Sequence, residues 1–212
     1  MSVKPEDLLA RNRRWAAARR AEDPEFFRRL SGQQAPKYFW IGCSDSRVPA
    51  PQIVDIDPGE IFVHRNVANL AGHTDLNFLS ALQFAVEVLR VEHVVVCGHY
   101  SCGGIQAALG ARSNGIVDHW IRSLRDLREK HRKILEGANG REEAADLLTE
   151  LNVRTQVDNI AYNPILQAAW QRGQRIEIHG WVYRVRDGIL HDLDYRRSDH
   201  EGIDESQKLS AD

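Results

Sequence analysis

Two apolar runs, each ended by a glycine and followed by a residue that can bind metal, most strongly constrain the fold of this chain. The run 37–42, KYFWIG, is rich in aromatic and branched residues and stops before Cys43, which is typical of a buried strand. The run 93–98, HVVVCG, is almost continuously apolar, as in a strand covered on both faces, and stops before His99. Both residues are therefore predicted to lie where strands end.

These strand ends predict a metal site. Ligands of an open parallel sheet collect beyond the carboxyl ends of its strands, so Cys43, His99 and Cys102 can meet there. Two thiolates and an imidazole are a set that zinc favours, and three protein ligands leave a fourth position for water. A structural zinc finger uses four ligands in two close pairs, whereas here one His-x-x-Cys pair joins a single remote cysteine. The pattern favours an open, catalytic site.

Other interpretations of the cysteines were weighed. A lone cysteine is usually an inert buried residue, and Cys97, inside the second apolar run, is interpreted in that way. Cys43 and Cys102 differ because polar and glycine neighbours leave a thiol accessible and allow its pKa to fall. Thiol catalysis is the alternative, but the three residues between Cys43 and Arg47 are too few for a loop that wraps a phosphate.

The two motifs carry a family resemblance. The segments CSDSR at 43–47 and HxxCG at 99–103 resemble the signature of the β-class carbonic anhydrases. The resemblance covers nearly the whole chain from about residue 36 to residue 193, and it continues through the segments 58–60, 64–69 and 178–183. The sequence departs from the common family pattern at Pro51 and Arg184, and neither departure touches a predicted ligand.

The resemblance implies a zinc enzyme that catalyses the reversible hydration of carbon dioxide to bicarbonate and a proton. Zinc held by the three ligands would bind a water and lower its pKa to about 7, supplying hydroxide that attacks the carbon. Asp45 would accept the hydrogen bond of this hydroxide, and Arg47 would hold Asp45 through a bidentate pair. Taken alone, Asp45 and Arg47 would be a surface ion pair of little value.

The same resemblance assigns further binding residues. Gln34 is expected to contact bicarbonate, and Phe62 and Phe84 are expected to line the carbon dioxide pocket, although both aromatic residues equally suit a core. Gly103 is placed in the substrate site with them.

One subgroup of the family has a second bicarbonate pocket away from the zinc, and Trp40, Arg65 and Tyr183 match its three residues. The alternative is a buried aromatic pair with a structural arginine. In that subgroup Asp45 can leave Arg47 and take the fourth zinc position. Low pH and bound bicarbonate would then favour this closed, inactive form.

The remaining patterns predict an α/β fold with a mostly parallel central sheet flanked by helices, as strand–helix–strand alternation requires. A second strand is expected over 53–56 and 60–64, bounded by Pro58-Gly59. Helices are expected over 76–90, 102–109, 117–136, 141–160 and 164–171. A strand over 175–183 is expected to turn at Asp187-Gly188 into a short partner, 189–190.

A single domain is expected over residues 1–212, with an N-terminal helical arm, 1–35, and a polar, partly mobile tail, 195–212. The arm is predicted to hold a helix from Pro5 and a short second helix, 25–30. Its Trp15 would need a place to bury its ring. The resembling family lays such helices across a neighbouring subunit, so a homodimer or homotetramer is expected.

Composition narrows the partners and the compartment. A formal net charge of −2 gives no reason to expect nucleic acid as a partner. The sequence shows neither the apolar core of a signal peptide nor a stretch of membrane-spanning length, so a cytosolic protein without a membrane partner is expected. Three cysteines, two of them proposed ligands, leave no disulfide framework.

Two rival functions were considered. The same scaffold could serve a hydrolase of carbon disulfide or carbonyl sulfide, which assays of the three substrates side by side would separate. A catalytically silent zinc-binding module is the other rival. The retention of Asp45 and Arg47 argues against it, because a structural site has no use for an aimed hydroxide.

Overall fold

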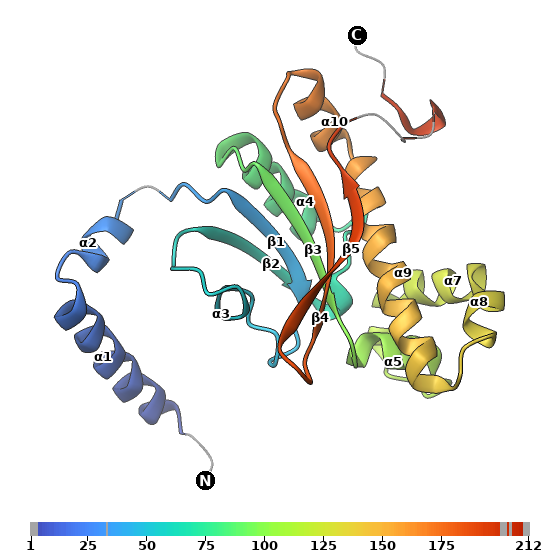
Figure 1. The fold of residues 1–212 in the computed structure, drawn as a ribbon, viewed down its shortest axis with the longest axis horizontal. Coiled ribbons are helices and arrows are strands. Elements are labelled where there is room, and N and C mark those ends of the chain that lie inside the picture. Colours follow the sequence, from blue (N-terminus) through green and yellow to red (C-terminus); the bar gives the residue numbers. More distant parts are fainter. Residues whose placement is uncertain (1–3, 33, 200–202, 204, 210–212) are drawn as a thin grey trace. The chain divides into compact units, whose positions relative to one another are not determined.

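A five-stranded sheet forms the centre of the larger of two units in this chain (Figure 1). The computed structural model describes residues 4–32, 34–199, 203 and 205–209. The chain divides into an N-terminal unit, Met1–Ala35, and a larger unit, Pro36–Asp212.

The sheet has the strand order β2-β1-β3-β4-β5, and all neighbouring strands are parallel except β4 and β5, which are antiparallel. The predicted mostly parallel sheet is confirmed. Because β1 and β3 are parallel neighbours, their carboxyl ends meet at one edge of the sheet. The strands are β1 (Tyr38–Cys43), β2 (Ile61–Asn66), β3 (His93–His99), β4 (Glu177–Arg184) and β5 (Ile189–Arg197).

Helices cover one face of the sheet with its largest apolar cluster. The helix α9 (Arg141–Ala161) packs along β3 and β4 (Figure 1), and α10 (Pro164–Gln171) and α4 (Leu76–Gln83) complete this layer. The side chain of Asp75 caps α4, and Asn163 caps α10 with Pro164 in the first turn, as expected for these residue types. A single π-helical turn, Phe84–Val88, extends α4.

Two further clusters complete the core of the larger unit. On the other face, Trp40, Val95 and Cys97 pack near the short helix α3 (Ala50–Ile53). Beyond the strand ends a third cluster contains Cys43 and Cys102. This cluster is built with α5 (Gly103–Leu109), α6 (Ile116–Trp120), α7 (Arg122–Lys130), α8 (Arg132–Glu136) and the 3-10 turn η1 (Val67–Asn69). Outside it, a further 3-10 turn, η3, spans Glu205–Gln207.

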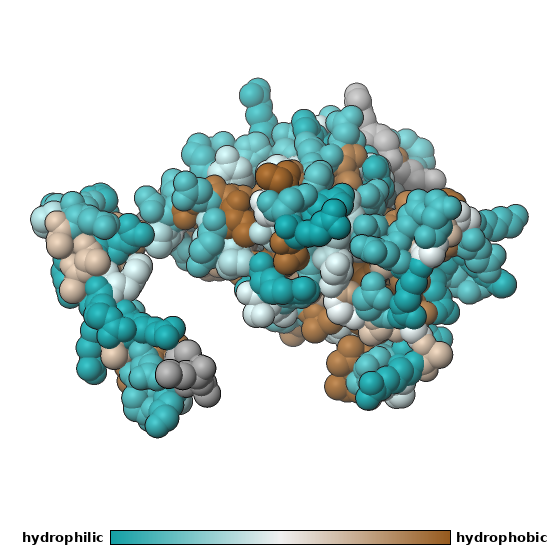
Figure 2. Space-filling model, turned by 60° about the horizontal axis from the view of Figure 1, so that its bottom comes forward, coloured by the Kyte–Doolittle hydropathy of each residue, from teal (hydrophilic) through white to brown (hydrophobic). Residues whose placement is uncertain are grey.

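The N-terminal unit is two helices, α1 (Pro5–Glu22) and α2 (Phe26–Leu30). The ring of Trp15 packs edge-on against Phe26 and Phe27, with centroid separations of 6.4 and 5.7 Å. This contact covers only part of the indole, because Trp15 remains 44% exposed. In the space-filling view, the surface of this unit carries a few hydrophobic patches among mostly hydrophilic side chains (Figure 2).

Three sequence predictions differ from the structure. The expected strand over 53–56 is absent, since the short helix α3 begins at Ala50 with Pro51 in its first turn, and Asp55 then adopts a left-handed φ of 49°. The expected helix over 117–136 is three helices, broken at Ile121 and His131. The tail predicted from residue 195 begins inside β5, which continues to Arg197, and Ile203 is buried.

Candidate metal centre

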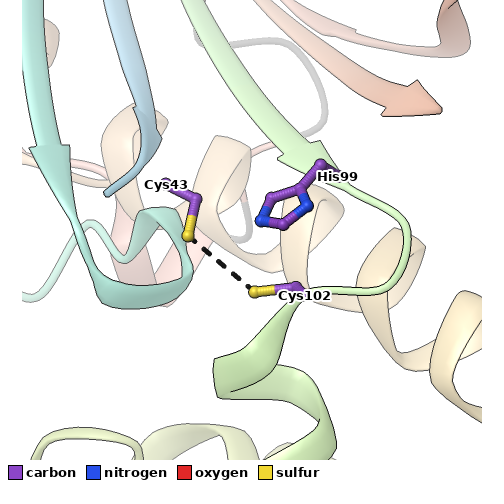
Figure 3. Close-up of side chains that lie close together, drawn as sticks. All are labelled: Cys43, His99 and Cys102. Carbon is purple, nitrogen blue, oxygen red and sulfur yellow. Dashed lines mark hydrogen bonds between the residues drawn. The ribbon is translucent and has the colours of Figure 1, made fainter. Parts of the chain in front are cut away.

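The three predicted metal ligands meet at the carboxyl edge of the sheet. Cys43 is the last residue of β1, His99 is the last residue of β3, and Cys102 is the residue that precedes α5. Their sulfur atoms and imidazole face one another (Figure 3), and one ligand atom from each lies within 4.8 Å of the other two. All three side chains are buried.

The geometry of this group fits zinc. The two sulfur atoms are 3.9 Å apart, and a tetrahedral zinc with Zn–S bonds near 2.3 Å sets its sulfur ligands about 3.8 Å apart. The Nδ1–H group of His99 donates a hydrogen bond to the Tyr100 carbonyl oxygen at 3.1 Å, and this bond fixes the orientation of the ring. The buried Nε2 atom has no hydrogen-bond partner. A metal ion would satisfy this atom, which is otherwise costly to bury.

The backbone around the ligands explains how they converge. Ser101 adopts a left-handed φ of 59°, so the chain reverses sharply between His99 and Cys102. The helix α5 then approaches η1 closely, since a Cβ added at Gly104 would lie 2.9 Å from the Cβ of Ala68. The amide of Ala68 donates to the Cys43 sulfur at 3.4 Å.

The two thiols are electrostatically coupled. The neighbouring Cys102 thiol, by donating its hydrogen, lowers the pKa of Cys43 below its usual range against the opposing effect of burial. The same contact and burial raise the pKa of Cys102 above its usual range. A divalent ion between the sulfurs would favour loss of the proton from both thiols.

Asp45 and Arg47 form a bidentate pair beside the ligands. The Nε and Nη2 atoms of Arg47 donate to the two carboxylate oxygens of Asp45 at 2.9 and 2.7 Å. This guanidinium holds the pKa of Asp45 well below its usual range. One oxygen of Asp45 lies 3.7 Å from Nε2 of His99, and among the described residues Asp45 does not join the group of mutually close ligand atoms.

The residues matched to a second bicarbonate pocket share one face of the sheet. Strand alternation and register place Trp40, Arg65 and Tyr183 on the face that carries Cys97. Trp40 and Tyr183 are buried in one apolar cluster. Arg65 donates from Nε to the Cys43 carbonyl at 2.8 Å and from Nη2 to the Asp45 carbonyl at 2.6 Å.

Of the other predicted substrate residues in the larger unit, Gly103 lies beside a metal ligand, whereas Phe62 and Phe84 do not. Gly103 is exposed beside Cys102, and a Cβ added there would meet no heavy atom within 4 Å. Phe62 and Phe84 contact each other, with centroids 5.8 Å apart, near the main core. They are not in the cluster that holds the ligands. Gln34 is an exposed residue of the N-terminal unit.

Sequence reasoning missed the residues that support the Cys43 side of the site. Asn66 bonds the backbone of Leu70 twice, and Asn152 donates to the Ala68 carbonyl at 3.0 Å. These contacts hold η1, in which Ala68 has a left-handed φ of 68°. The segment 64–69 belonged to the family resemblance, but nothing in the sequence indicated that the Ala68 amide reaches the sulfur.

Comparisons with known proteins agree with this geometry. The sequence matches the carbonic anhydrase family over residues 38–190. A carbonic anhydrase of Emericella nidulans is 43% identical over 186 residues, which are 88% of this chain and 82% of that protein. The structure matches a Coccomyxa β-carbonic anhydrase in complex with acetazolamide with a TM-score of 0.90 at 40% identity, covering 94% of this chain and 90% of that one.

A tetrameric β-carbonic anhydrase from Sordaria macrospora matches with a TM-score of 0.86 at 36% identity, covering 90% of this chain and 97% of that one. Among the residues that the structure describes, no helix is long and apolar enough to cross a membrane.

Proposed function

The chain belongs to the β-class carbonic anhydrase family, and from this membership we infer that it is a zinc enzyme catalysing the reversible hydration of carbon dioxide to bicarbonate and a proton. The observation that carries this function is the close group of Cys43, His99 and Cys102 at the sheet edge. When bound there, zinc would act as a Lewis acid and lower the pKa of a water molecule to about 7.

The chain's own residues hold and orient the reacting groups. The carbonyl of Tyr100 fixes the His99 ring so that Nε2 faces the site, and the Ala68 amide supports the Cys43 sulfur. Asp45, kept ionised by Arg47, is the acceptor that orients the attacking oxygen toward carbon dioxide. Because Arg47 occupies both carboxylate oxygens, Asp45 stays near the metal site without joining its ligands.

The ligand assignment is tested with cobalt in place of zinc, because thiolate ligands give cobalt an intense near-ultraviolet charge-transfer band. Cys43→Ala and Cys102→Ala should weaken this band, and His99→Ala should lower cobalt occupancy of the site. Cys97→Ala is the matched control, because Cys97 is buried within β3 and is not one of the three predicted ligands. The charge-transfer band of this variant should equal that of the parent. Loss of the band in Cys97→Ala alone would show that the ligands are assigned wrongly.

We also propose that Gln34, Phe62, Phe84 and Gly103 contact the substrate. Gly103 is supported by its exposed position next to a ligand. The assignment of Gln34, Phe62 and Phe84 is supported by the family resemblance. Phe62 precedes Asn66, the register partner of Cys43, by four residues, or about 13 Å along the strand. The two phenylalanines therefore fit a substrate pocket best if they serve the site of a neighbouring subunit.

We further propose that bicarbonate regulates the enzyme through Trp40, Arg65 and Tyr183. Arg65 supports this proposal because it bonds the carbonyls of Cys43 and Asp45, and so connects the face with the aromatic pair to the residues that carry catalysis. A bicarbonate bound by Arg65 would compete for these bonds and release Asp45 from Arg47. Asp45 would then become the fourth metal ligand of a closed form, which bicarbonate stabilises only through its higher affinity for that form.

The regulation is tested by the hydration rate against pH at several bicarbonate concentrations. We expect the parent to be inhibited more deeply by bicarbonate at low pH. Trp40→Phe removes the indole N–H and Tyr183→Phe removes the hydroxyl that would donate hydrogen bonds to bicarbonate, and each keeps an aromatic ring. Both variants should lose this inhibition. Tyr38→Phe, on an exposed tyrosine, is the control. Product inhibition that is purely competitive and the same in all four proteins would exclude the switch.

We propose that the enzyme is a cytosolic homodimer or homotetramer, with N-terminal helices exchanged between subunits. The support for exchange is the apolar surface that α1 leaves exposed, including Leu8, Leu9 and Trp15. The related Sordaria macrospora enzyme is tetrameric. The support for the cytosol is that all three cysteines are free and two of them belong to the metal centre.

A further inference from the structure

A second group of metal-binding side chains lies at the opposite edge of the sheet. One nitrogen each of His93 and His179 and one carboxylate oxygen of Glu177 all lie within 4.8 Å of one another. The strands β3 and β4 begin at His93 and Glu177, whereas the Cys43 centre lies where β3 ends. His93 and His99 are six positions apart along β3, which corresponds to about 20 Å. The two groups are therefore independent.

Strand pairing brings these three residues together. In the parallel register of β3 and β4, His93 lies beside Glu177, and Val95 lies beside His179. Residues two apart in a strand share a face, so His93 has Glu177 as its lateral neighbour and His179 as its diagonal neighbour on one face. The group is thus built on paired strands of a sheet, which position side chains more rigidly than loops do.

The distances within the group suit a four-coordinate ion. Nδ1 of His93 lies 3.1 Å from Nε2 of His179, and a carboxylate oxygen of Glu177 lies 3.6 Å from that Nε2 and 4.0 Å from that Nδ1. Ligand atoms around a tetrahedral zinc, with bonds of about 2.0 to 2.2 Å, are about 3.3 to 3.6 Å apart. The three observed distances bracket this spacing.

Neighbouring rings hold the two imidazoles, and the group stays open to solvent. Tyr38 stacks on His93 with centroids 5.2 Å apart, and Trp181 packs against His179 at 5.7 Å. The side chains of His93, Glu177 and His179 are 32%, 36% and 11% exposed. An ion held there would keep at least one position for water.

The arginine that pairs with His179 across the sheet is already neutralised by a carboxylate. Arg196, on β5, is the register partner of His179, and its guanidinium is paired with Asp192 at 2.6 Å. In the absence of an ion, the facing nitrogens of the two imidazoles share one hydrogen bond, and Glu177 lies against both rings. An ion would replace that single shared proton with three ligand bonds.

We propose that His93, Glu177 and His179 form a second metal site, which binds one divalent ion of the zinc class and ties β3 to β4. Two imidazoles and one carboxylate are a ligand set that suits zinc and the neighbouring late transition metals, and they contain no sulfur. This composition separates the second site chemically from the cysteine centre.

Metal stoichiometry of the full chain tests the proposal. After dialysis against micromolar free zinc, elemental analysis should find two zinc ions per chain in the parent and one in His93→Asn and in Glu177→Gln. His119→Asn is the matched control, because His119 is an exposed histidine outside both groups, and it should keep two. One zinc per chain in the parent, or two in Glu177→Gln, would overturn the second site.

Cobalt provides a second readout that does not depend on activity. The double variant Cys43→Ala, Cys102→Ala lacks both thiolates, so any cobalt it binds at His93, Glu177 and His179 should show weak visible bands without a sulfur band. Adding Glu177→Gln to this variant should abolish the visible bands while circular dichroism stays unchanged. Visible bands that survive Glu177→Gln would place the cobalt elsewhere and refute the assignment.

Discussion

Asp45 is the residue whose substitution separates metal binding from turnover. Its carboxylate is paired with Arg47 through two hydrogen bonds and lies 3.7 Å from the ligand nitrogen of His99. Asp45→Asn replaces an acceptor oxygen with an amide donor, and Arg47→Ala releases the carboxylate. Both variants should keep zinc but lose at least about 100-fold in turnover, because the lost interaction is made to the reacting oxygen. Stopped-flow hydration at saturating carbon dioxide measures this.

The control for this prediction is Glu136→Gln, which alters another carboxylate paired with an arginine, Arg132, at 2.7 Å. It is exposed and lies on α8, so its turnover should equal that of the parent. Turnover near the parent value in Asp45→Asn would exclude Asp45 from the reaction.

Single residues differ in how well the sequence predicts them. Cys43 and His99 were predictable because a glycine at the end of each apolar run indicates where a strand stops, and parallel strands bring such ends together. Cys102 was predictable because it forms a His-x-x-Cys pair with His99. Cys97 was correctly interpreted as buried, and burial raises the pKa of its thiol. The contact from the Ala68 amide was not predictable, because it depends on a left-handed alanine held by the distant Asn152.

Among the elements, β5 is held to α9 by a tyrosine with a shifted pKa. The hydroxyl of Tyr195 donates to Asp158 at 2.7 Å, and Arg197 pairs with the same carboxylate at 2.9 Å. Burial, followed by the contact with Asp158, raises the pKa of Tyr195 to about 12. An unfolded tyrosine titrates near 10, so this contribution to stability is complete below pH 10 and is lost as the pH rises toward 12.

Tyr195→Phe should therefore lower the free energy of unfolding by about 2 kcal/mol at pH 8, because the hydroxyl loses both its bond to Asp158 and the bond it accepts from Arg197 at 2.8 Å. The difference from the parent should shrink between pH 10 and pH 12. Urea unfolding at fixed protein concentration measures it. Tyr38→Phe is the control and should change stability by less than about 0.5 kcal/mol, since this residue is partly exposed. A difference that grows above pH 10 would contradict the assignment.

Helices were predicted best where their ends carry a local signal. The range 164–171 was predicted correctly because the helix start has a local signal: Asn163 caps the first turn of α10, and Pro164 suits its first position. The breaks at Ile121 and His131 were missed because apolar spacing continues through them. The strand β5 is longer than the predicted range 189–190 because Tyr195 and Arg197 bond to Asp158 of α9, which is distant in sequence.

For the whole molecule, the N-terminal helices predict self-association. The helix α1 buries none of its residues, and Leu8, Leu9 and Trp15 stay exposed. Because helices in proteins are stabilised mainly by packing of their apolar side chains, we expect another subunit to cover this apolar surface. Sedimentation at micromolar concentration should give the mass of a dimer or a tetramer. The double variant Leu9→Ala, Trp15→Ala should sediment with a lower molecular mass, because fewer subunits associate. A fully active monomer would reject this prediction.

The hydration rate of one purified sample, measured with zinc, after zinc removal and after zinc is restored, tests the assigned activity most directly. The function inferred from Cys43, His99 and Cys102 predicts rapid hydration of carbon dioxide by the zinc-loaded chain. Chelation should reduce the rate to that of buffer, and added zinc should restore it. A zinc-loaded chain that hydrates carbon dioxide no faster than buffer, or a rate that persists after the zinc is removed, would contradict the assignment.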